Sequence, residues 1–418
     1  MSVEEIRRLT PGEEIFAGAH AYIGHAVLVA GRVDEDALAA AFDAVVRSYP
    51  VVGAALKPHP DGGHVLVTSE TPPAISVVAG DPDDLLAGSV LDQGVRLGAV
   101  GLVRDGARAS VTLSLHHSVA DGAHGVALLA ALWSRYADAV EGRPVVVEPH
   151  GYPLPAEQVL TARGVVKIPL DRLPRVVDCV PPAPPVEVAA GEDESEVDER
   201  GFLALRATRV LLTVEQTAGL VALARAEGVT VNSLVSAAIL LAEAECRGCS
   251  LAHLLHVYAV NLRPMVSPPV GAAEATNLVG SAVYPPTTTS PTELVGLARA
   301  IRSELESQVA AGLPLQTPLH LGDAPEEGEP TTRLVVAATN FGRIPELPST
   351  AGSVFEEYRV AMAGKPIPGG SRHAVSGTCV IHSFGGRLGV EVHHSAAMAG
   401  WERRRTGRVR AALVSAVR

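Results

Sequence analysis

Residues 116–122 read His116-His117-Ser118-Val119-Ala120-Asp121-Gly122, and this heptapeptide lies where a predicted strand meets a predicted helix. The strand is predicted over Arg108–Leu115 from its alternating pattern, after a hairpin turn at Asp105-Gly106. Apolar residues at helical spacing predict a helix after Gly122. A side chain at such a junction is held rigidly and still projects into a cleft. We therefore expect the heptapeptide to carry the chemistry of the protein.

The residue types of the heptapeptide suit acid–base chemistry. An imidazole with a pKa near neutrality can accept a proton from a hydroxyl and later return it to a leaving thiolate. Asp121 can fix the local geometry or pair with a cation, and a structural salt bridge is favoured over proton transfer. Gly122 permits close approach of the backbone, and the amides at a helix start can stabilise a developing oxyanion.

A zinc site is the main alternative for the same residues. His117, Asp121 and His124 are spaced i, i+4 and i+7, so they would share one face if all three were on a helix. Because His117 is predicted to be on the strand side of the junction, this spacing is broken. We expect no metal.

A second segment of the chain resembles the heptapeptide region. Leu113–Ser118 (LSLHHS) is similar to Val390–Ser395 (VEVHHS), and each segment follows a predicted hairpin and precedes a predicted helix. Asp121 of the first copy corresponds to Met398 of the second. The sequence therefore predicts two related halves with one active copy.

The organisation of the chain follows from its length and its proline content. A chain of 418 residues predicts two domains, and strand and helix patterns mix in both halves, as in an α/β protein. Residues 146–206 are rich in proline and contain the acidic run Gly191–Arg200, so they are predicted to be an extended crossover. We expect one subdomain over residues 1–145, this linker, and a second subdomain over residues 207–418.

Composition and charge argue against several classes of protein. The chain has 34 basic and 46 acidic residues, a formal net charge of −12, so no nucleic-acid partner is expected. Its apolar runs are shorter than the ~20 residues of a membrane span, and Met1–His20 has no signal-peptide pattern. The four cysteines make no disulfide framework in so long a chain, and the pair in Cys246–Cys249 is expected to be incidental. We expect a cytoplasmic monomer.

The heptapeptide matches HHxxxDG, the signature of the chloramphenicol-acetyltransferase-like acyltransferases, which include condensation domains. Three further blocks resemble the flanking blocks of that superfamily, in the same order: Val33–Pro50 (VDEDALAAAFDAVVRSYP), Ala259–Pro264 (AVNLRP) and Thr339–Pro345 (TNFGRIP). The similarity is greatest to the polyketide-associated acyltransferase family, typified by phthiocerol/phthiodiolone dimycocerosyl transferase. There it extends over nearly the whole chain, notably around Ser134–Tyr136 and Glu274–Leu278 (EATNL).

This resemblance implies a fold and a set of site residues. The fold would be two chloramphenicol-acetyltransferase-like subdomains, with mixed sheets flanked by helices and an active-site tunnel at their interface. His117, the second histidine of the motif, would be the general base, and Asp121 would form a salt bridge with Arg263 of the NLRP block. Gly122 would offer its backbone to the oxyanion, whereas His116 and Asn340 would contact substrate.

The implied reaction is O-acyl transfer by direct attack, without an acyl-enzyme. The co-substrate would be an acyl-CoA or a phosphopantetheinyl acyl carrier protein, with no permanently bound cofactor. The acceptor would be a small-molecule alcohol, a polyketide-derived lipid or natural product. Two alternatives stay open: a tailoring acetyltransferase that acts on an antibiotic scaffold, and a non-catalytic relative that binds thioesters or carrier proteins. Neither the acyl chain length nor the identity of the acceptor follows from the sequence.

One basic cluster stands out on this acidic chain. Arg403-Arg404-Arg405 lies near the C-terminus, followed by Arg408 and Arg410. A solvated helix face is the simpler interpretation. The alternative is a docking surface for an acyl carrier protein, a polyketide synthase or the phosphates of coenzyme A.

Overall fold

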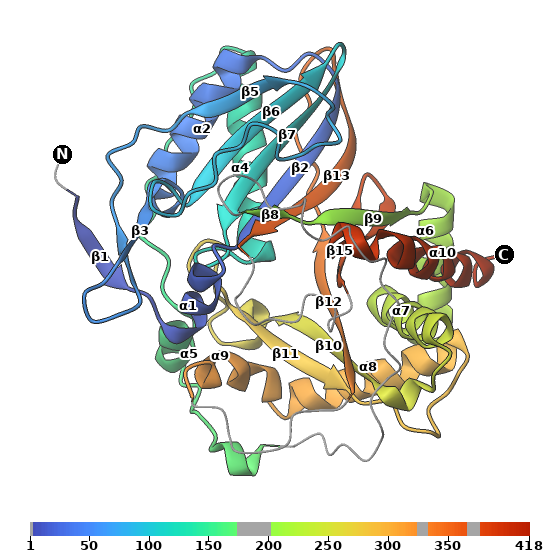
Figure 1. The fold of residues 1–418 in the computed structure, drawn as a ribbon. Coiled ribbons are helices and arrows are strands. Elements are labelled where there is room, and N and C mark those ends of the chain that lie inside the picture. The colour runs from blue at the N-terminus through green and yellow to red at the C-terminus, as the bar shows by residue number, and fades with distance from the viewer. Residues whose placement is uncertain (1–2, 174–201, 324–332, 366–376) are drawn as a thin grey trace.

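The computed structural model describes residues 3–173, 202–323, 333–365 and 377–418 (Figure 1). Two six-stranded sheets with helices packed against them make up most of the molecule. Both sheets are mixed, because β5–β6 in the first and β10–β12–β14 in the second are parallel pairs among antiparallel ones. The predicted fold class, an α/β chain of two halves with mixed sheets flanked by helices, is confirmed.

The first sheet and its helices bury the core of the N-terminal half. The strand order is β5 (Ile75–Ala79), β6 (Gly98–Asp105), β7 (Arg108–His116), β2 (Tyr22–Gly31), β13 (Ser353–Gly364) and β8 (Leu203–Ala204). Its helices are α1 (Pro11–Gly18), α2 (Glu35–Ser48), α3 (Pro50–Gly53) and α4 (Gly122–Val140), and a small sheet of β1 (Glu5–Arg8), β4 (His64–Val67) and β3 (Ala55–Pro58) lies beside them. Helical spacing brings Leu38 and Phe42 of α2 into one core with Leu129 and Trp133 of α4.

The second sheet forms the C-terminal half. The strand order is β11 (Val279–Tyr284), β10 (Leu254–Asn261), β12 (Leu334–Arg343), β14 (Thr378–Phe384), β15 (Arg387–His394) and β9 (Arg206–Leu211). The helices are α6 (Val214–Ala226), α7 (Val231–Arg247), α8 (Leu294–Ala310), α9 (Gln316–His320) and α10 (Ala399–Ser415), with short 3-10 turns η2 (Leu251–His253), η3 (Arg263–Met265), η4 (Leu313–Leu315) and η5 (Ala396–Met398). Helix α7 is buried along most of its length, as its apolar sequence predicts.

The predicted domain bounds at residues 145 and 207 stay a prediction, and one strand does not follow them. β13, from the C-terminal half of the chain, pairs with β2 from Ser353↔Gly31 to Ala363↔Tyr22, so it is a strand of the first sheet. The C-terminal half of the chain therefore contributes β13 to the first sheet, where it lies beside β2 in Figure 1. Alternation along a strand shows which face is buried but not which sheet the strand joins, so the sequence pattern could not reveal this exchange.

The predicted linker is partly structured. It holds helix α5 (Ala156–Ala162) and the turn η1 (Leu170–Arg172), and β8 at Leu203–Ala204 adds to the first sheet. Helix α5 buries Val159 and Leu160 against Leu262 and Leu278 of the C-terminal half, so this part of the crossover contributes to the core. The acidic run Gly191–Arg200 lies outside the described residues.

The predicted internal repeat is confirmed in the topology. The hairpin β6–β7 is followed by α4, and the hairpin β14–β15 is followed by α10. The aspartate side chain at the start of α4 accepts a hydrogen bond from the helix backbone. At the matching place before α10, Met398 is simply buried. Only the first copy therefore keeps the acidic residue of the motif.

Buried polar groups join the two sheets through β13. Tyr358 on β13 shares a 2.7 Å hydrogen bond with Nδ1 of His25 on β2. The ring of Tyr358 also meets the edge of the His382 ring on β14, with 4.9 Å between centroids. The Nε2 atom of His382 lies 3.1 Å from Oε1 of Glu391 on β15, and the other oxygen of Glu391 accepts from the Val360 amide. These contacts fix how the halves meet.

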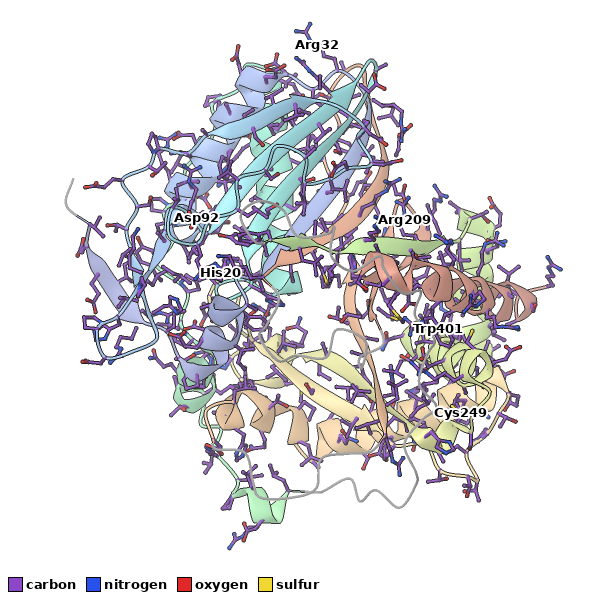
Figure 2. The ribbon with its side chains drawn as sticks, in the orientation of Figure 1. His20, Arg32, Asp92, Arg209, Cys249 and Trp401 are labelled. Atoms are coloured by element: carbon purple, nitrogen blue, oxygen red, sulfur yellow. The ribbon has the colours of Figure 1, made fainter. Side chains whose placement is uncertain are left out.

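The basic cluster on α10 is split between core and surface. Arg403 and Arg404 are exposed, whereas the side chain of Arg405 is 1% exposed and pairs with Glu243 on α7 at 2.7 Å and with Glu402 at 2.8 Å. The prediction that Arg405 belongs to a docking surface is therefore wrong. Consecutive residues on a helix are about 100° apart, so three arginines in a row cannot all face solvent when α10 packs on α7. Trp401, labelled on α10 in Figure 2, lies under the Arg404 guanidinium.

Within the described ranges, no single helix has the length and hydropathy required to cross a membrane. Helices α6 and α7 pass that test only as a pair, with a bend of 103° between them.

Replacing Arg405 with alanine should destabilise the fold strongly. The change leaves Glu402 buried without its cation, and breaking one partner of a buried pair costs about 3–5 kcal/mol of unfolding free energy. Arg408→Ala is the matched control, because its pair with Glu245 is exposed and contributes about 0–1 kcal/mol. Urea unfolding of both variants measures the difference, and equal small losses would contradict the assignment of Arg405 to the core.

Candidate active site

His117 lies in the loop between β7 and α4, at the interface of the two halves. Its backbone amide donates to the Ala21 carbonyl at 2.7 Å, which anchors the loop to the start of β2. Its ring stacks on Phe16 of α1, with 4.0 Å between centroids and 23° between planes. The strand-to-helix junction predicted from the sequence is therefore present, and it presents a partly buried imidazole.

The hydrogen bonds of His117 fix its tautomer. Nδ1 lies 3.1 Å from the Ala120 carbonyl oxygen and 3.2 Å from Oδ1 of Asn277. The amide nitrogen of Asn277 donates to the His117 carbonyl at 2.5 Å, which turns its oxygen toward the ring. Both partners of Nδ1 are acceptors, so Nδ1 carries the proton and Nε2 keeps a free lone pair. Nε2 is thus the basic nitrogen of the ring.

Burial shifts the pKa of His117 downward. Desolvation disfavours the imidazolium and is the largest cause, while the Asp121 carboxylate and the hydrogen bonds from the ring oppose it. The net direction is a pKa below the ordinary 6.5, so the ring is neutral at pH 7.

Asp121 uses both carboxylate oxygens in structural contacts. Oδ1 accepts from the His124 amide at 2.9 Å and caps helix α4. Oδ2 accepts from Arg263 Nη1 at 2.7 Å and from the Leu278 amide at 3.0 Å. The predicted pairing of Asp121 with Arg263 is confirmed, with side chains 1% and 6% exposed. Because both of its oxygens already accept hydrogen bonds, the Asp121 carboxylate is an orienting group. It holds the motif against the C-terminal half.

Gly122 is required by close packing. A Cβ at this position would lie 2.4 Å from the ring of Phe341 on β12, so any other residue would force that ring out of its place beside α4. Gly122 also lines the cavity beside His117. Its contact with an oxyanion stays a prediction.

Two predicted substrate contacts lie outside the cavity lining. His116 is fully buried, its Nε2 2.8 Å from Oε1 of Gln93, and its Nδ1 accepts from the Ser118 amide. Burial lowers the pKa of His116 to about 3. Asn340 is exposed and donates to Asn232, while its neighbours Thr339 and Phe341 line the cavity. These placements favour structural roles for both residues, because neighbouring side chains on a strand point to opposite sides.

The cavity around His117 draws its walls from both halves. Its volume is about 320 Å³, and its lining includes residues of α1, α5, β10, β11, α9 and β12. Glu13 of α1 lines it too, where it pairs with Arg7 at 2.7 Å and accepts from the Thr276 hydroxyl at 2.9 Å. A cavity is therefore present at the interface of the two halves, where the sequence resemblance implied a tunnel.

Sequence reasoning missed three residues that shape this site. Asn277 was inside the recognised EATNL block, but nothing in the sequence placed it against His117. Phe16 and Glu13 lie about 100 residues before the motif, and no spacing rule connects them to it. All three reach His117 or its cavity only through the tertiary fold.

The possible metal ligands and the cysteines were also located in the structure. Among residues 3–173, 202–323, 333–365 and 377–418, no group of three His, Cys, Asp or Glu side chains is arranged to hold a metal ion. Cys246 and Cys249 are free thiols whose pKa values are raised, chiefly by burial. Cys249, labelled in Figure 2, follows the C-terminal end of α7 and is not among the residues that line the cavity.

Comparison with known proteins gives one consistent family. A family model described as the C-terminus of phthiocerol/phthiodiolone dimycocerosyl transferase matches residues 203–393. The phthiocerol/phthiodiolone dimycocerosyl transferase of Mycobacterium sp. (strain JLS) is 37% identical over 349 residues, 82% of this chain and 82% of the relative.

Solved structures with the same fold agree with this family assignment. Polyketide synthase associated protein 5 from Mycobacterium tuberculosis superposes with a TM-score of 0.80 and 30% identity, covering 100% of this chain and 99% of that one. The first condensation domain of the calcium-dependent antibiotic synthetase, with a TM-score of 0.64 and 15% identity over 99% of this chain and 97% of that one, shares the fold alone. Because a curated relative is 37% identical over 82% of both chains, this chain belongs to the phthiocerol/phthiodiolone dimycocerosyl transferase family of acyltransferases.

Proposed function

We propose that the protein transfers an acyl group from a thioester to the hydroxyl of a polyketide-derived lipid or natural product, with His117 as the general base. The observation that carries this proposal is the fixed tautomer of His117, whose Nδ1 proton is held by two acceptors while Nε2 stays basic. The cavity beside it has walls from both halves, so two substrates can meet there.

The chemistry needs one proton carrier. Nε2 of His117 accepts the proton of the acceptor hydroxyl as its oxygen attacks the thioester carbonyl carbon, and a C–O bond forms. The tetrahedral intermediate then collapses, the C–S bond breaks, and the thiolate takes the proton back from Nε2. No covalent acyl-enzyme is required. Backbone amides at the start of α4, beside Gly122, stabilise the oxyanion in this scheme.

The substrate class rests on the relatives. Their names describe transfer of dimycocerosyl groups to phthiocerol or phthiodiolone, and a solved structure with the same fold is named as polyketide synthase associated. We take the donor to be an acyl-CoA or an acyl group on a phosphopantetheinyl carrier protein. The exposed Arg403 and Arg404 are the proposed contact for the phosphates or for an acidic carrier.

The first test is thiol release from acyl-CoA donors in the presence and absence of simple alcohols. Release that depends on alcohol should fall about 10²- to 10⁴-fold in His117→Ala, because the base is lost. The control is His253→Ala, whose histidine lies on η2 outside the cavity. Mass spectrometry of the ester identifies the product. Release that the His117 substitution leaves unchanged would overturn the assignment, and binding of donors without release would favour a non-catalytic relative.

The pH dependence follows from the lowered pKa of His117. The neutral ring is the active form, so kcat/KM should rise with pH through a midpoint below 6.5 and stay level from about pH 7 to 8. Initial rates in a constant-ionic-strength buffer series measure the profile, with circular dichroism to confirm that the protein stays folded. A midpoint clearly above 6.5 would contradict burial as the dominant influence on this histidine.

Asn277 should act as a positioning residue for His117. In Asn277→Leu the oxygen that holds the Nδ1 proton is removed, so kcat should fall about 10- to 100-fold with KM little changed. The hydrogen bond to Asn277 raises the pKa of His117, so its loss should also move the acid limb of the rate profile to lower pH. Asn277→Asp keeps an acceptor and adds a negative charge, which should move that limb to higher pH. Identical profiles in both variants would indicate a merely structural role.

A further inference from the structure

A second and larger cavity lies next to the catalytic one. Its volume is about 630 Å³, and it is bounded by β11, the end of α8, α9 and the turn η1. Ser281 and Thr317 line both cavities. The hydroxyl of Thr317 accepts from the Ser281 amide at 3.0 Å, so one hydrogen-bonded pair of residues is the boundary between the two spaces. The catalytic scheme above makes no use of the larger one.

Strand β11 runs continuously from one cavity into the other. Its exposure alternates, so Val279, Ser281 and Val283 point to the same side of the strand. Val279 and Ser281 line the catalytic cavity, and Ser281 and Val283 line the second cavity. At a rise of about 3.3 Å per residue, the three side chains span roughly 13 Å along β11, from Val279 in the His117 cavity to Val283 in the second one. An extended molecule bound along this side of β11 would therefore contact the lining of both spaces.

The walls of the second cavity carry apolar side chains that are only half-buried. Leu170 and Leu173 come from the crossover, Val283 from β11 and Leu313 from η4. Apolar surface gathered in a concave site is costly to leave in water and is typical of a ligand site.

The polar side chains of the same walls are largely engaged with the protein itself. Gln308 donates to the Val283 carbonyl at 2.6 Å and accepts from the Val283 amide at 3.0 Å. Gln316 makes the same kind of paired contact with Ile168 and Val166 in the crossover.

Charge does not favour an ionic ligand in this cavity. Glu304 accepts from Gln308 at 2.6 Å, and Arg333 donates to the Pro286 carbonyl at 2.9 Å. Glu304 and Arg333 offset each other, and His320, the third ionisable residue of the lining, has both ring nitrogens engaged, with Asp323 at 2.7 Å and the Ile168 carbonyl at 2.9 Å. Hydrogen-bonding capacity already satisfied by the protein, together with apolar side chains, favours a hydrocarbon ligand.

We propose that the second cavity is a subsite for the saturated hydrocarbon chain of one of the two substrates. The reacting end of that substrate lies beside His117, and its chain passes Ser281 and Thr317 and continues along β11. This inference rests on the proposed function for the identity of the reacting end. The two cavities, about 320 and 630 Å³, have the size of sites that hold drug-sized or lipid-sized ligands.

The test fills the subsite and measures selectivity for chain length. Val283→Trp blocks the cavity from β11, and Ala311→Trp narrows it from the exposed end of α8, so a folding defect in one variant does not decide the outcome. The matched control is Val309→Trp, a partly exposed position on α8 that does not line the cavity.

Two series of substrates distinguish the source of the chain. One varies the acyl-CoA from acetyl to dodecanoyl with a short alcohol, and the other varies a primary alcohol from ethanol to dodecanol with acetyl-CoA. Each buried methylene is worth about a fourfold gain in kcat/KM. In one series the ratio of kcat/KM for the longest to the shortest member should fall about 10- to 100-fold in both filling variants and stay unchanged in Val309→Trp. Ratios unaffected in both series would overturn the proposal.

A binding measurement separates this inference from the reaction. The fluorescent probe 11-(dansylamino)undecanoic acid is titrated into the full chain carrying His117→Ala, alone and combined with Val283→Trp or Val309→Trp. Binding should weaken at least tenfold with Val283→Trp only. If it does so while no thioester is turned over by the wild-type protein, the hydrocarbon subsite stands and the reaction proposed above falls. Equal affinity in all three proteins would remove the subsite even if transfer is observed.

Discussion

The site depends on one buried ion pair between the two halves. Asp121 caps α4 with one oxygen and holds Arg263 and the Leu278 amide with the other. The segment that follows Arg263 in the chain is thereby fixed against the motif, and Asn277 within it reaches the ring of His117. Removing either charge would leave the other buried without a partner, which destabilises the fold. The pair therefore holds the two halves in one relative position. The basic nitrogen of His117 is oriented because that interface is fixed.

A second constraint keeps the halves from separating. β13 leaves the C-terminal half to complete the first sheet, and Tyr358 on it contacts both His25 and His382. Because β13 comes from the C-terminal half, pairs in the first sheet and contacts both sheets through Tyr358, the interface is a shared core rather than a hinge. If His117 is the base, as proposed, this fixed interface would leave it needing little rearrangement during reaction, which is how fixed polar groups contribute most to catalysis.

The motif predicted the site only as far as local geometry allows. A strand followed by a helix places His117 and the capping Asp121 correctly, since both positions depend on neighbours within a few residues. The partner Arg263 followed from the resemblance to condensation domains rather than from any spacing. His116 and Asn340 were predicted to contact substrate, yet neither is among the residues that line the cavity. A motif marks neighbours in sequence, whereas strand alternation sends adjacent side chains to opposite sides.

By itself, the sequence determined the fold class, the repeat of hairpin and helix, the family and the candidate base His117, because periodicity and a compact motif are local properties. The tertiary structure alone decided that β13 joins the first sheet, that Arg405 is buried, that Phe16 and Asn277 contact His117, and that a second cavity adjoins the first. These features join residues about 100 or more positions apart or consist of the space between elements. Contacts of that kind depend on how faces pack, and a linear pattern specifies which face is apolar but not which surface will cover it.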